Sequence, residues 1–236
     1  MVIAQNPDVL VLWDIDHTLI ETRGVGGAAF AAAFEQVVHQ PLLQMPQVTG
    51  RTEPDIYRAT AALHAVDDPP AFEVFAEALA TAYRERQTDL ALTGRIMPGA
   101  EEALGQLASL TTVRQSVLTG NTRTVAEIKL ATFGLDSHLD LTVGAFGDDD
   151  RHRPTLVSIA QARAKTAFGQ TFCERNTVLV GDSPGDVATA VEGGARIIAV
   201  AAGGSPATTL TGAELILDDL TDIAALMRAV RSLSRP

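Results

Sequence analysis

Short apolar runs without polar alternation recur along the chain and constrain its fold more than any other feature. We expect a buried strand at each of the runs 9–13, 115–118, 177–180 and 197–200, and a weaker one at 215–217. Segments whose apolar residues are three and four apart lie between them, notably 98–107 and 123–133, as is typical of helices. Continuous apolar strands that alternate with helices favour an α/β fold with a doubly wound parallel sheet, covered on both faces.

One long stretch breaks this alternation. From residue 24 to 92 the chain is rich in alanine and has helical periodicity, with no convincing strand. We therefore predict an α/β core domain from residues 1–22 and 93–236, with an all-helical cap domain of residues 23–92 inserted after the first strand. The glycines of residues 22–27 suit a hinge between the two.

Composition and charge exclude several classes of protein. The chain has 236 residues, of which 46% are hydrophobic, and a formal net charge of −11. Such an acidic chain is a poor ligand for polyanions, so we expect no nucleic-acid partner. No run approaches the ~20 apolar residues of a membrane span, and no basic segment followed by an apolar stretch begins the chain, so we expect a cytoplasmic protein without membrane contact. The single cysteine, Cys173, excludes an intramolecular disulfide.

The sharpest motif follows the first apolar run. Asp14 and Asp16 are two residues apart, and Thr18 comes next in the opening loop. Both carboxylates can reach the same pocket, where one can act as a nucleophile and the other can donate or accept a proton. Taken alone, the motif is equally compatible with an ordinary strand end that carries two solvated acids.

A second acidic pair strengthens the functional interpretation. Asp182 and Asp186 follow another buried strand and are about one helical turn apart. If the two strands are neighbours, the four acids converge and repel one another unless a cation lies between them. Oxygen-only ligands favour Mg²⁺. The alternative, in which Asp182 caps a helix and Asp186 is solvated, accounts for each acid singly but not for their repeated placement after strands.

A third motif follows the run 115–118. Thr119, Gly120 and Asn121 offer a hydroxyl group and backbone N–H groups just before a predicted helix, which is a typical phosphate-binding arrangement. A plain helix N-cap explains the same residues and is the favoured interpretation when this motif is taken singly.

Together these motifs resemble those of the haloacid dehalogenase-like (HAD) superfamily, and the resemblance covers nearly the whole chain. The segments that carry it are Asp14-Ile15-Asp16-His17-Thr18, Leu118-Thr119-Gly120-Asn121 and Gly181-Asp182-Ser183-Pro184-Gly185-Asp186. The insert resembles the helical cap of the phosphoglycolate phosphatase and β-phosphoglucomutase subgroup. The resemblance implies a Rossmann-like core.

The resemblance also implies a role for each matching residue. Asp14 would attack phosphorus and form an aspartyl-phosphate, and Asp16 would protonate the leaving group and then activate water. Thr119 would hold a phosphoryl oxygen, with Gly120 and Asn121 beside it, while Thr18 would shape the phosphate loop. Mg²⁺ would be bound by the carboxylates of Asp14 and Asp182, the backbone carbonyl of Asp16 and, as a further or indirect ligand, Asp186.

The chain departs from the family pattern at two places. His17 stands where the family usually has glycine. The lysine that the family pairs with the nucleophile is missing from residues 150–154. Arg151 matches its spacing to the following proline, but Arg153 fits better the members that use arginine, so we favour Arg153 and keep Arg151 open. In the predicted cap, Arg51 is expected to face substrate, although an exposed charge beside a helix is an equally good explanation.

The resulting expectation is a Mg²⁺-dependent phosphatase for a small phosphorylated metabolite, acting as a monomer or homodimer. A phosphomutase of the β-phosphoglucomutase type, using the same aspartyl-phosphate, is the closest alternative. A catalytically silent binding module with this fold is a third possibility: the four acids argue against it, and the missing lysine keeps it open.

Overall fold

Within residues 9–233, which the computed structural model describes, five parallel strands form the central sheet. In spatial order they are β4 (Val113–Val117), β1 (Val9–Trp13), β5 (Thr177–Gly181), β6 (Arg196–Val200) and β7 (Leu215–Leu217). Every neighbouring pair is parallel, so the expected α/β sheet is confirmed. Residues 1–8 and 234–236 of the predicted core domain lie outside the described residues.

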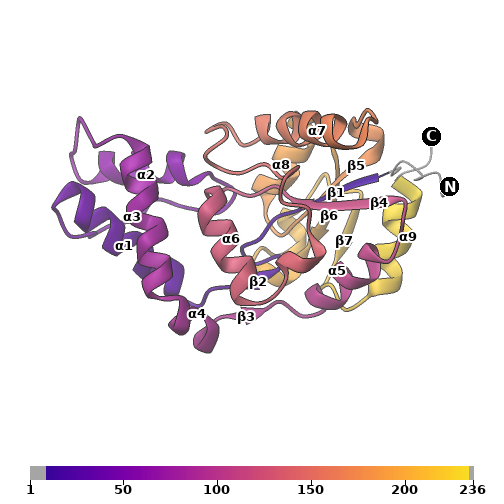
Figure 1. The fold of residues 1–236 in the computed structure, drawn as a ribbon, viewed down its shortest axis with the longest axis horizontal. Coiled ribbons are helices and arrows are strands. Elements are labelled where there is room, and N and C mark those ends of the chain that lie inside the picture. The colour runs from indigo at the N-terminus through magenta and orange to yellow at the C-terminus, as the bar shows by residue number, and fades with distance from the viewer. Residues whose placement is uncertain (1–8, 234–236) are drawn as a thin grey trace.

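Helices cover both faces of this sheet (Figure 1). On one face lie α5 (Ala100–Ala108), α6 (Arg123–Thr132) and α9 (Ile223–Leu233), and on the other lie α7 (Thr155–Phe168) and α8 (Pro184–Gly193). Strand β1 supplies side chains to both hydrophobic cores: Val9, Val11 and Trp13 face α5 and α6, whereas Leu10 and Leu12 face α7 and α8. Because successive side chains point to opposite faces, a strand covered on both sides is apolar throughout.

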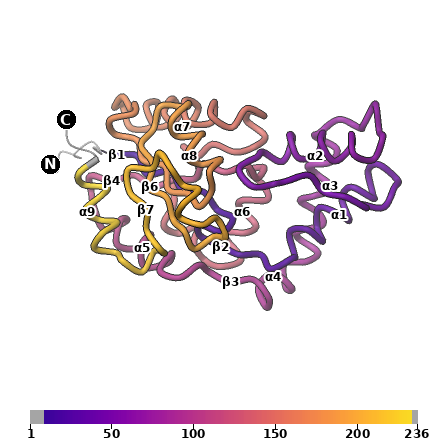
Figure 2. The backbone as a smooth tube through the Cα atoms, turned by 180° about the vertical axis from the view of Figure 1, so that it is seen from behind, coloured from indigo at the N-terminus to yellow at the C-terminus, as the bar shows by residue number. Residues whose placement is uncertain are grey.

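Four further helices gather at one end of the elongated molecule (Figures 1 and 2). They are α1 (Val25–Val38), α2 (Glu53–Leu63), α3 (Phe72–Glu85) and α4 (Gln87–Thr93). Their own aromatic core includes Phe30, Tyr57 and Phe75, with the Tyr57 and Phe75 rings stacked at 4.3 Å between centroids. The helical nature of the insert is as expected, and the domain division at residues 22/23 and 92/93 stays a prediction. We call these four helices and their connecting loops the cap.

A short antiparallel pair joins the two ends of the cap. Strand β2 (Ile20–Glu21) pairs with β3 (Arg95–Ile96), and the Arg95 guanidinium contacts the Glu21 carboxylate at 2.6 Å. In this pair, the segment through which the chain leaves the core (β2) lies beside the segment through which it returns (β3). Neither strand was expected from the sequence.

The remaining regular elements are single 3₁₀ turns. Within the described part of the chain they are η1 (Asp136–His138), η2 (Glu174–Asn176), η3 (Ala201–Gly203) and η4 (Ala207–Thr209). None of the helices between residues 9 and 233 combines the length and the apolar character that crossing a bilayer requires.

Candidate active site

Strands β4, β1 and β5, which are neighbours in the sheet, end in register at the edge that faces the cap. Trp13, the last residue of β1, pairs with Val117 of β4 and with Val180 of β5. The polar residues that follow these strands are therefore delivered to the same place. Among them Asp14, Thr119 and Asp182 line a single cavity of about 510 Å³ between the sheet and the cap.

Three acidic side chains form a buried cluster in this cavity. Oxygen atoms of Asp14, Asp182 and Asp186 lie within 4.8 Å of one another, and these residues are 6%, 4% and 1% exposed. Asp186 is fixed at the first turn of α8, where its carboxylate accepts hydrogen bonds from the Ser183 N–H and hydroxyl at 3.0 and 2.6 Å. Ser183 caps the helix, so neither Asp182 nor Asp186 has the capping or solvated role that the alternative interpretation gave it.

The electrostatics of this cluster suit a bound cation. Burial raises the pKa of Asp14 well above its usual value, repulsion from Asp186 raises it further, and Arg153 opposes both effects. Burial, together with repulsion from Asp186 and Asp16, raises the pKa of Asp182 to about 7. A divalent cation among these oxygens would offset both the repulsion and the desolvation. An oxygen-only donor set fits Mg²⁺.

Of the two arginines that were candidates to replace the family lysine, only Arg153 lies in the cavity. It precedes α7, and its Nη2 donates to Asp14 Oδ1 at 2.7 Å and to Asp186 Oδ1 at 2.6 Å. Arg151 is exposed and does not line the cavity, while its backbone carbonyl accepts a hydrogen bond from the Thr52 hydroxyl. The guanidinium of Arg153 therefore bridges two members of the acidic cluster, the candidate nucleophile Asp14 and Asp186.

Sequence reasoning missed Lys129, which holds Asp16. The Lys129 ammonium contacts both Asp16 carboxylate oxygens at 2.7 and 2.8 Å and Asn121 Oδ1 at 2.7 Å. Asn121 in turn donates to Asp16 at 2.7 Å and to the Thr119 hydroxyl at 2.8 Å. Burial alone would raise the pKa of Asp16, but Lys129 and Asn121 outweigh it and hold that pKa below its usual value.

A signal for Lys129 was present in the sequence. Lys129 stands on the same face of α6 as the buried residues Val125, Ala126 and Leu130, and its side chain is only 3% exposed. A lysine on the buried stripe of a helix needs an acidic or hydrogen-bonding partner, because an unpaired buried ammonium is very costly. The helix that holds this lysine directly follows the predicted phosphate-binding motif at Thr119. Its position therefore indicates that Lys129 belongs to the site.

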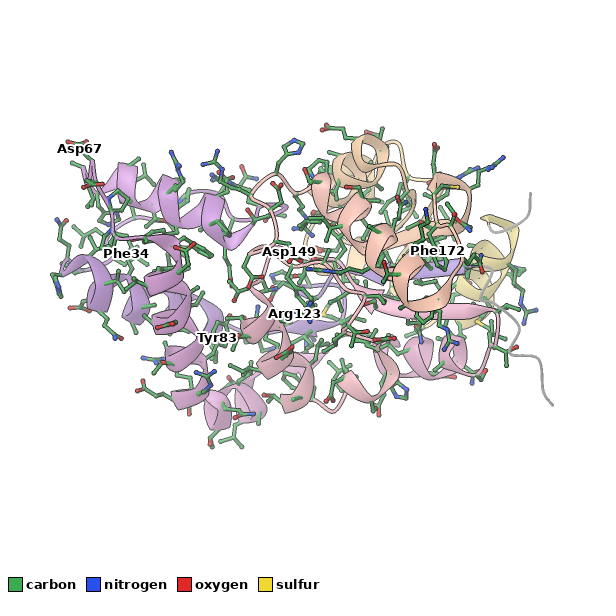
Figure 3. The ribbon with its side chains drawn as sticks, turned by 45° about the horizontal axis from the view of Figure 1, so that its top comes forward. Phe34, Asp67, Tyr83, Arg123, Asp149 and Phe172 are labelled. Atoms are coloured by element: carbon green, nitrogen blue, oxygen red, sulfur yellow. The ribbon has the colours of Figure 1, made fainter. Side chains whose placement is uncertain are left out.

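Two cap residues were also missed. Glu53, at the start of α2, is 7% exposed and accepts a hydrogen bond from the Thr122 N–H at 2.7 Å. Burial raises the pKa of Glu53 to about 7, against the opposing effect of Lys129. Tyr83 lies on α3 where that helix faces α6 (Figure 3), with the Lys129 ammonium 5.3 Å from its ring centroid. Burial raises the pKa of Tyr83 to about 12.

The loop that carries Arg51 docks closely on the core. The Glu53 N–H donates to the Gly120 carbonyl at 2.8 Å, and a Cβ atom on Gly120 would lie 2.0 Å from the Arg51 carbonyl oxygen. Only glycine at position 120 permits this approach. Arg51 lines the cavity, but its Nε donates to Asp55 at 2.7 Å, so its charge is already engaged within the cap.

Two residues of the first motif are placed differently from the rest. Thr18, expected at the phosphate, is fully buried and does not line the cavity; its hydroxyl donates to Asp182 Oδ1 at 3.4 Å. This placement favours support of Asp182 over direct phosphate contact. His17 lines the cavity with a φ of 63°, a conformation that glycine adopts freely, which explains why the family usually has glycine there.

Comparison with known proteins places this geometry in a family. The model of the haloacid dehalogenase-like hydrolase family matches residues 11–200. None of the curated proteins compared with the chain matches it significantly.

Solved structures share the fold across almost the whole chain. A hydrolase from Pseudomonas syringae has a TM-score of 0.69 at 19% identity, covering 96% of this chain and 99% of that one. CbbY from Rhodobacter sphaeroides, in complex with phosphate, has a TM-score of 0.66 at 18% identity, covering 91% and 95%. A predicted phosphoglycolate phosphatase from Haemophilus somnus 129PT has a TM-score of 0.64 at 20% identity, covering 94% and 99%. With the family match over most of its length, the chain belongs to the haloacid dehalogenase-like hydrolase family.

Proposed function

We propose that the protein is a Mg²⁺-dependent phosphatase that hydrolyses a small phosphate monoester through an aspartyl-phosphate on Asp14. The observation that carries the proposal is the acidic cluster of Asp14, Asp182 and Asp186 with the Arg153 guanidinium between two of its members. Asp16 lines the same cavity and supplies a second carboxyl group for proton transfer.

In the first step the Asp14 carboxylate attacks phosphorus and the ester P–O bond breaks. Asp16 gives its proton to the departing oxygen, so the products are the free alcohol and a phosphorylated Asp14. Arg153, which already contacts Asp14, balances negative charge between the nucleophile and the phosphate. Because Lys129 favours the ionised form of Asp16, this step suits a leaving group that needs little protonation.

In the second step Asp16, now a carboxylate, takes a proton from water while the water oxygen attacks phosphorus. The bond between phosphorus and Asp14 breaks and inorganic phosphate leaves. The ion pair with Lys129 and the hydrogen bond from Asn121 hold Asp16 in place in the carboxylate form that this step needs. Thr119, oriented by the Asn121 amide, is positioned to hold a phosphoryl oxygen.

The residues that would hold the metal are Asp14 and Asp182, with the Asp16 backbone carbonyl. Asp186 would support them indirectly, because both of its oxygens already accept hydrogen bonds from Arg153 and Ser183. When bound, Mg²⁺ supplies positive charge that offsets the repulsion between an anionic nucleophile and an anionic phosphate.

Removal of the metal tests the proposal as a whole. We expect EDTA to stop phosphate release from phenyl phosphate and Mg²⁺ to restore it. Without the metal, the carboxylates of the cluster repel each other and the substrate. Phosphate release and the metal content of the protein should be measured on the same sample. Full activity in protein shown to be free of metal would contradict the proposal, and sugar-phosphate isomerisation without phosphate release would favour the phosphomutase alternative.

Lys129→Met should lower kcat by about 10–100-fold, as is common when a group that orients a reacting side chain is lost. Without the ammonium, Asp16 loses its strongest partner and its pKa rises, so the acidic limb of the pH–rate profile for hydrolysis of the aspartyl-phosphate, the step that needs the Asp16 carboxylate, should move to higher pH. The change should be larger in kcat than in KM.

Lys165→Met is the matched control, because Lys165 is the only other lysine of the chain and is exposed on α7. It should leave kcat and the pH–rate profile unchanged. An unshifted profile in Lys129→Met would show that Lys129 acts only on folding.

A further inference from the structure

The end of the cavity that would receive the leaving group is apolar. Away from the acidic cluster, the lining comes from the cap helices α1, α2 and α3 and from the loop before α2. The apolar side chains that line it are Phe30, Met45, Val48, Ile56, Leu79 and Tyr83. A surface of this kind favours an alcohol with an apolar body and offers no hydration to a charged group.

Every lysine and arginine that lines the cavity is already paired with an acidic side chain. Arg51 contacts Asp55 at 2.7 Å and Lys129 contacts Asp16 at 2.7 Å, while Arg153 contacts both members of its own acidic pair. The remaining basic residue of the lining, His17, is exposed and lies close enough to Asp16 and Glu21 to lower the pKa of both. No lysine or arginine of the lining is left to bind a second anionic group on the substrate.

Above its raised pKa of about 7, Glu53 adds a negative charge at this end. Glu53 lines the cavity and is 7% exposed; its carboxylate accepts a hydrogen bond from the backbone N–H of Thr122, and Lys129 lies near enough to lower its pKa without forming an ion pair that fixes it. The lining as a whole carries more acids than lysines and arginines. The acids are Asp14, Asp16, Glu53, Asp182 and Asp186, against Arg51, Lys129 and Arg153. The charge of a bound Mg²⁺ would act at the acidic cluster, at the core end of the cavity, and not at Glu53.

We propose that the site selects phosphate monoesters whose alcohol carries no second anionic group, and that Glu53 is the residue that rejects the others. This inference rests on the proposed phosphatase function and names its substrate class. An anionic group on the leaving alcohol would lose its hydration against the apolar wall and would face the Glu53 carboxylate without a cation to pair with. Monoesters of uncharged alcohols meet no such cost.

Two matched substrate pairs test the selection with Mg²⁺ present and at a pH of about 8, where Glu53 is ionised. The first is 2-hydroxyethyl phosphate against 2-phosphoglycolate, which differ in a CH₂OH group against a carboxylate. The second is phenyl phosphate against 4-carboxyphenyl phosphate. We expect kcat/KM to be at least about tenfold higher for the member of each pair whose alcohol carries no carboxylate. The aromatic pair is the stricter test, because its carboxylate makes the phenol a better leaving group.

Glu53→Gln tests the residue itself. Glutamine keeps an oxygen to accept the Thr122 N–H, so the contact between α2 and α6 persists while the charge is lost. We expect the preference to shrink several-fold through a gain on the carboxylate-bearing substrates. Glu73→Gln, an exposed position on α3, makes the same change in net charge away from the cavity and should leave the preference as it is.

The outcomes separate the two proposals. Phosphate release from none of the four esters would contradict the phosphatase function itself. Release with equal or higher kcat/KM for the carboxylate-bearing members would overturn the substrate class and leave the phosphatase intact. A preference that Glu53→Gln does not change would overturn the role of Glu53. If that variant does not fold, the two pairs measured on the unmodified protein still decide the substrate class.

Discussion

Asp14→Asn should abolish turnover, with a fall on the order of 10⁴-fold or more in kcat, while the fold persists. The amide has the shape of the carboxylate but is a far weaker nucleophile toward phosphorus. Stability should not suffer, because Asp14 is buried beside Asp182 and Asp186 and its negative charge is unfavourable there without metal. In metal-free protein we therefore expect the Tm of the variant to equal or exceed that of the parent.

The measurement is steady-state phosphate release with Mg²⁺, together with thermal unfolding in EDTA. Asp89→Asn is the control, since Asp89 is exposed on α4 and undergoes the same chemical change. It should retain the parent rate. A rate near that of the parent in purified Asp14→Asn would remove Asp14 from the reaction.

Arg153→Ala should lower kcat by about 10²–10³-fold, the usual effect of removing one group that stabilises charge in a transition state. The change removes the hydrogen bond from the guanidinium to Asp14 Oδ1 and leaves Asp14 and Asp186 without their shared counter-charge. Arg153→Lys keeps the charge but not the planar fork, so it should recover part of the rate.

Arg151→Ala is the matched control two residues away. Its side chain is exposed and outside the cavity, and its contact with Thr52 uses the backbone carbonyl, which the substitution keeps. We expect the parent rate, measured on the same substrate with folding checked by circular dichroism. Equal losses in Arg151→Ala and Arg153→Ala would refute the assignment of the bridging role to Arg153.

Strands that are covered on both faces were predictable from the sequence. The run 9–13 is apolar at every position because its side chains enter two cores, and it was placed at its observed bounds. Strand β4 was placed two residues late, at 115–118 instead of Val113–Val117. Its apolar signal is weak because Arg114 is exposed and Gln115 is a buried polar residue that accepts a hydrogen bond from the Trp13 indole.

The short pair β2 and β3 could not be predicted. Each strand has two residues, which is too few for any periodicity, and the two pair across the whole length of the cap. Helix α4 was not predicted as a helix of its own either, because its seven residues are too few for a clear periodicity and only Arg86 stands between it and α3.

The residues of the candidate site likewise include some that were predictable from the sequence and some that were not. The acids after β1 and β5 were predictable, because the carboxyl ends of neighbouring parallel strands meet at one edge. Glu53 and Tyr83 were not, because they reach the cavity only through the docking of the cap on the core, which no local pattern encodes. Arg151 and Arg153 could not be separated by spacing alone; burial separates them.

Chemical trapping of the phosphorylated side chain tests the central claim most directly. Protein mixed with phenyl phosphate and Mg²⁺ is quenched within a turnover and treated with borohydride, which reduces an acyl phosphate to an alcohol and so converts a phosphorylated aspartate to homoserine. Peptide mass spectrometry should find homoserine at position 14 and aspartate at positions 16, 182 and 186. Phosphate release without any reduction at position 14, or with reduction at another of these residues, would contradict the account.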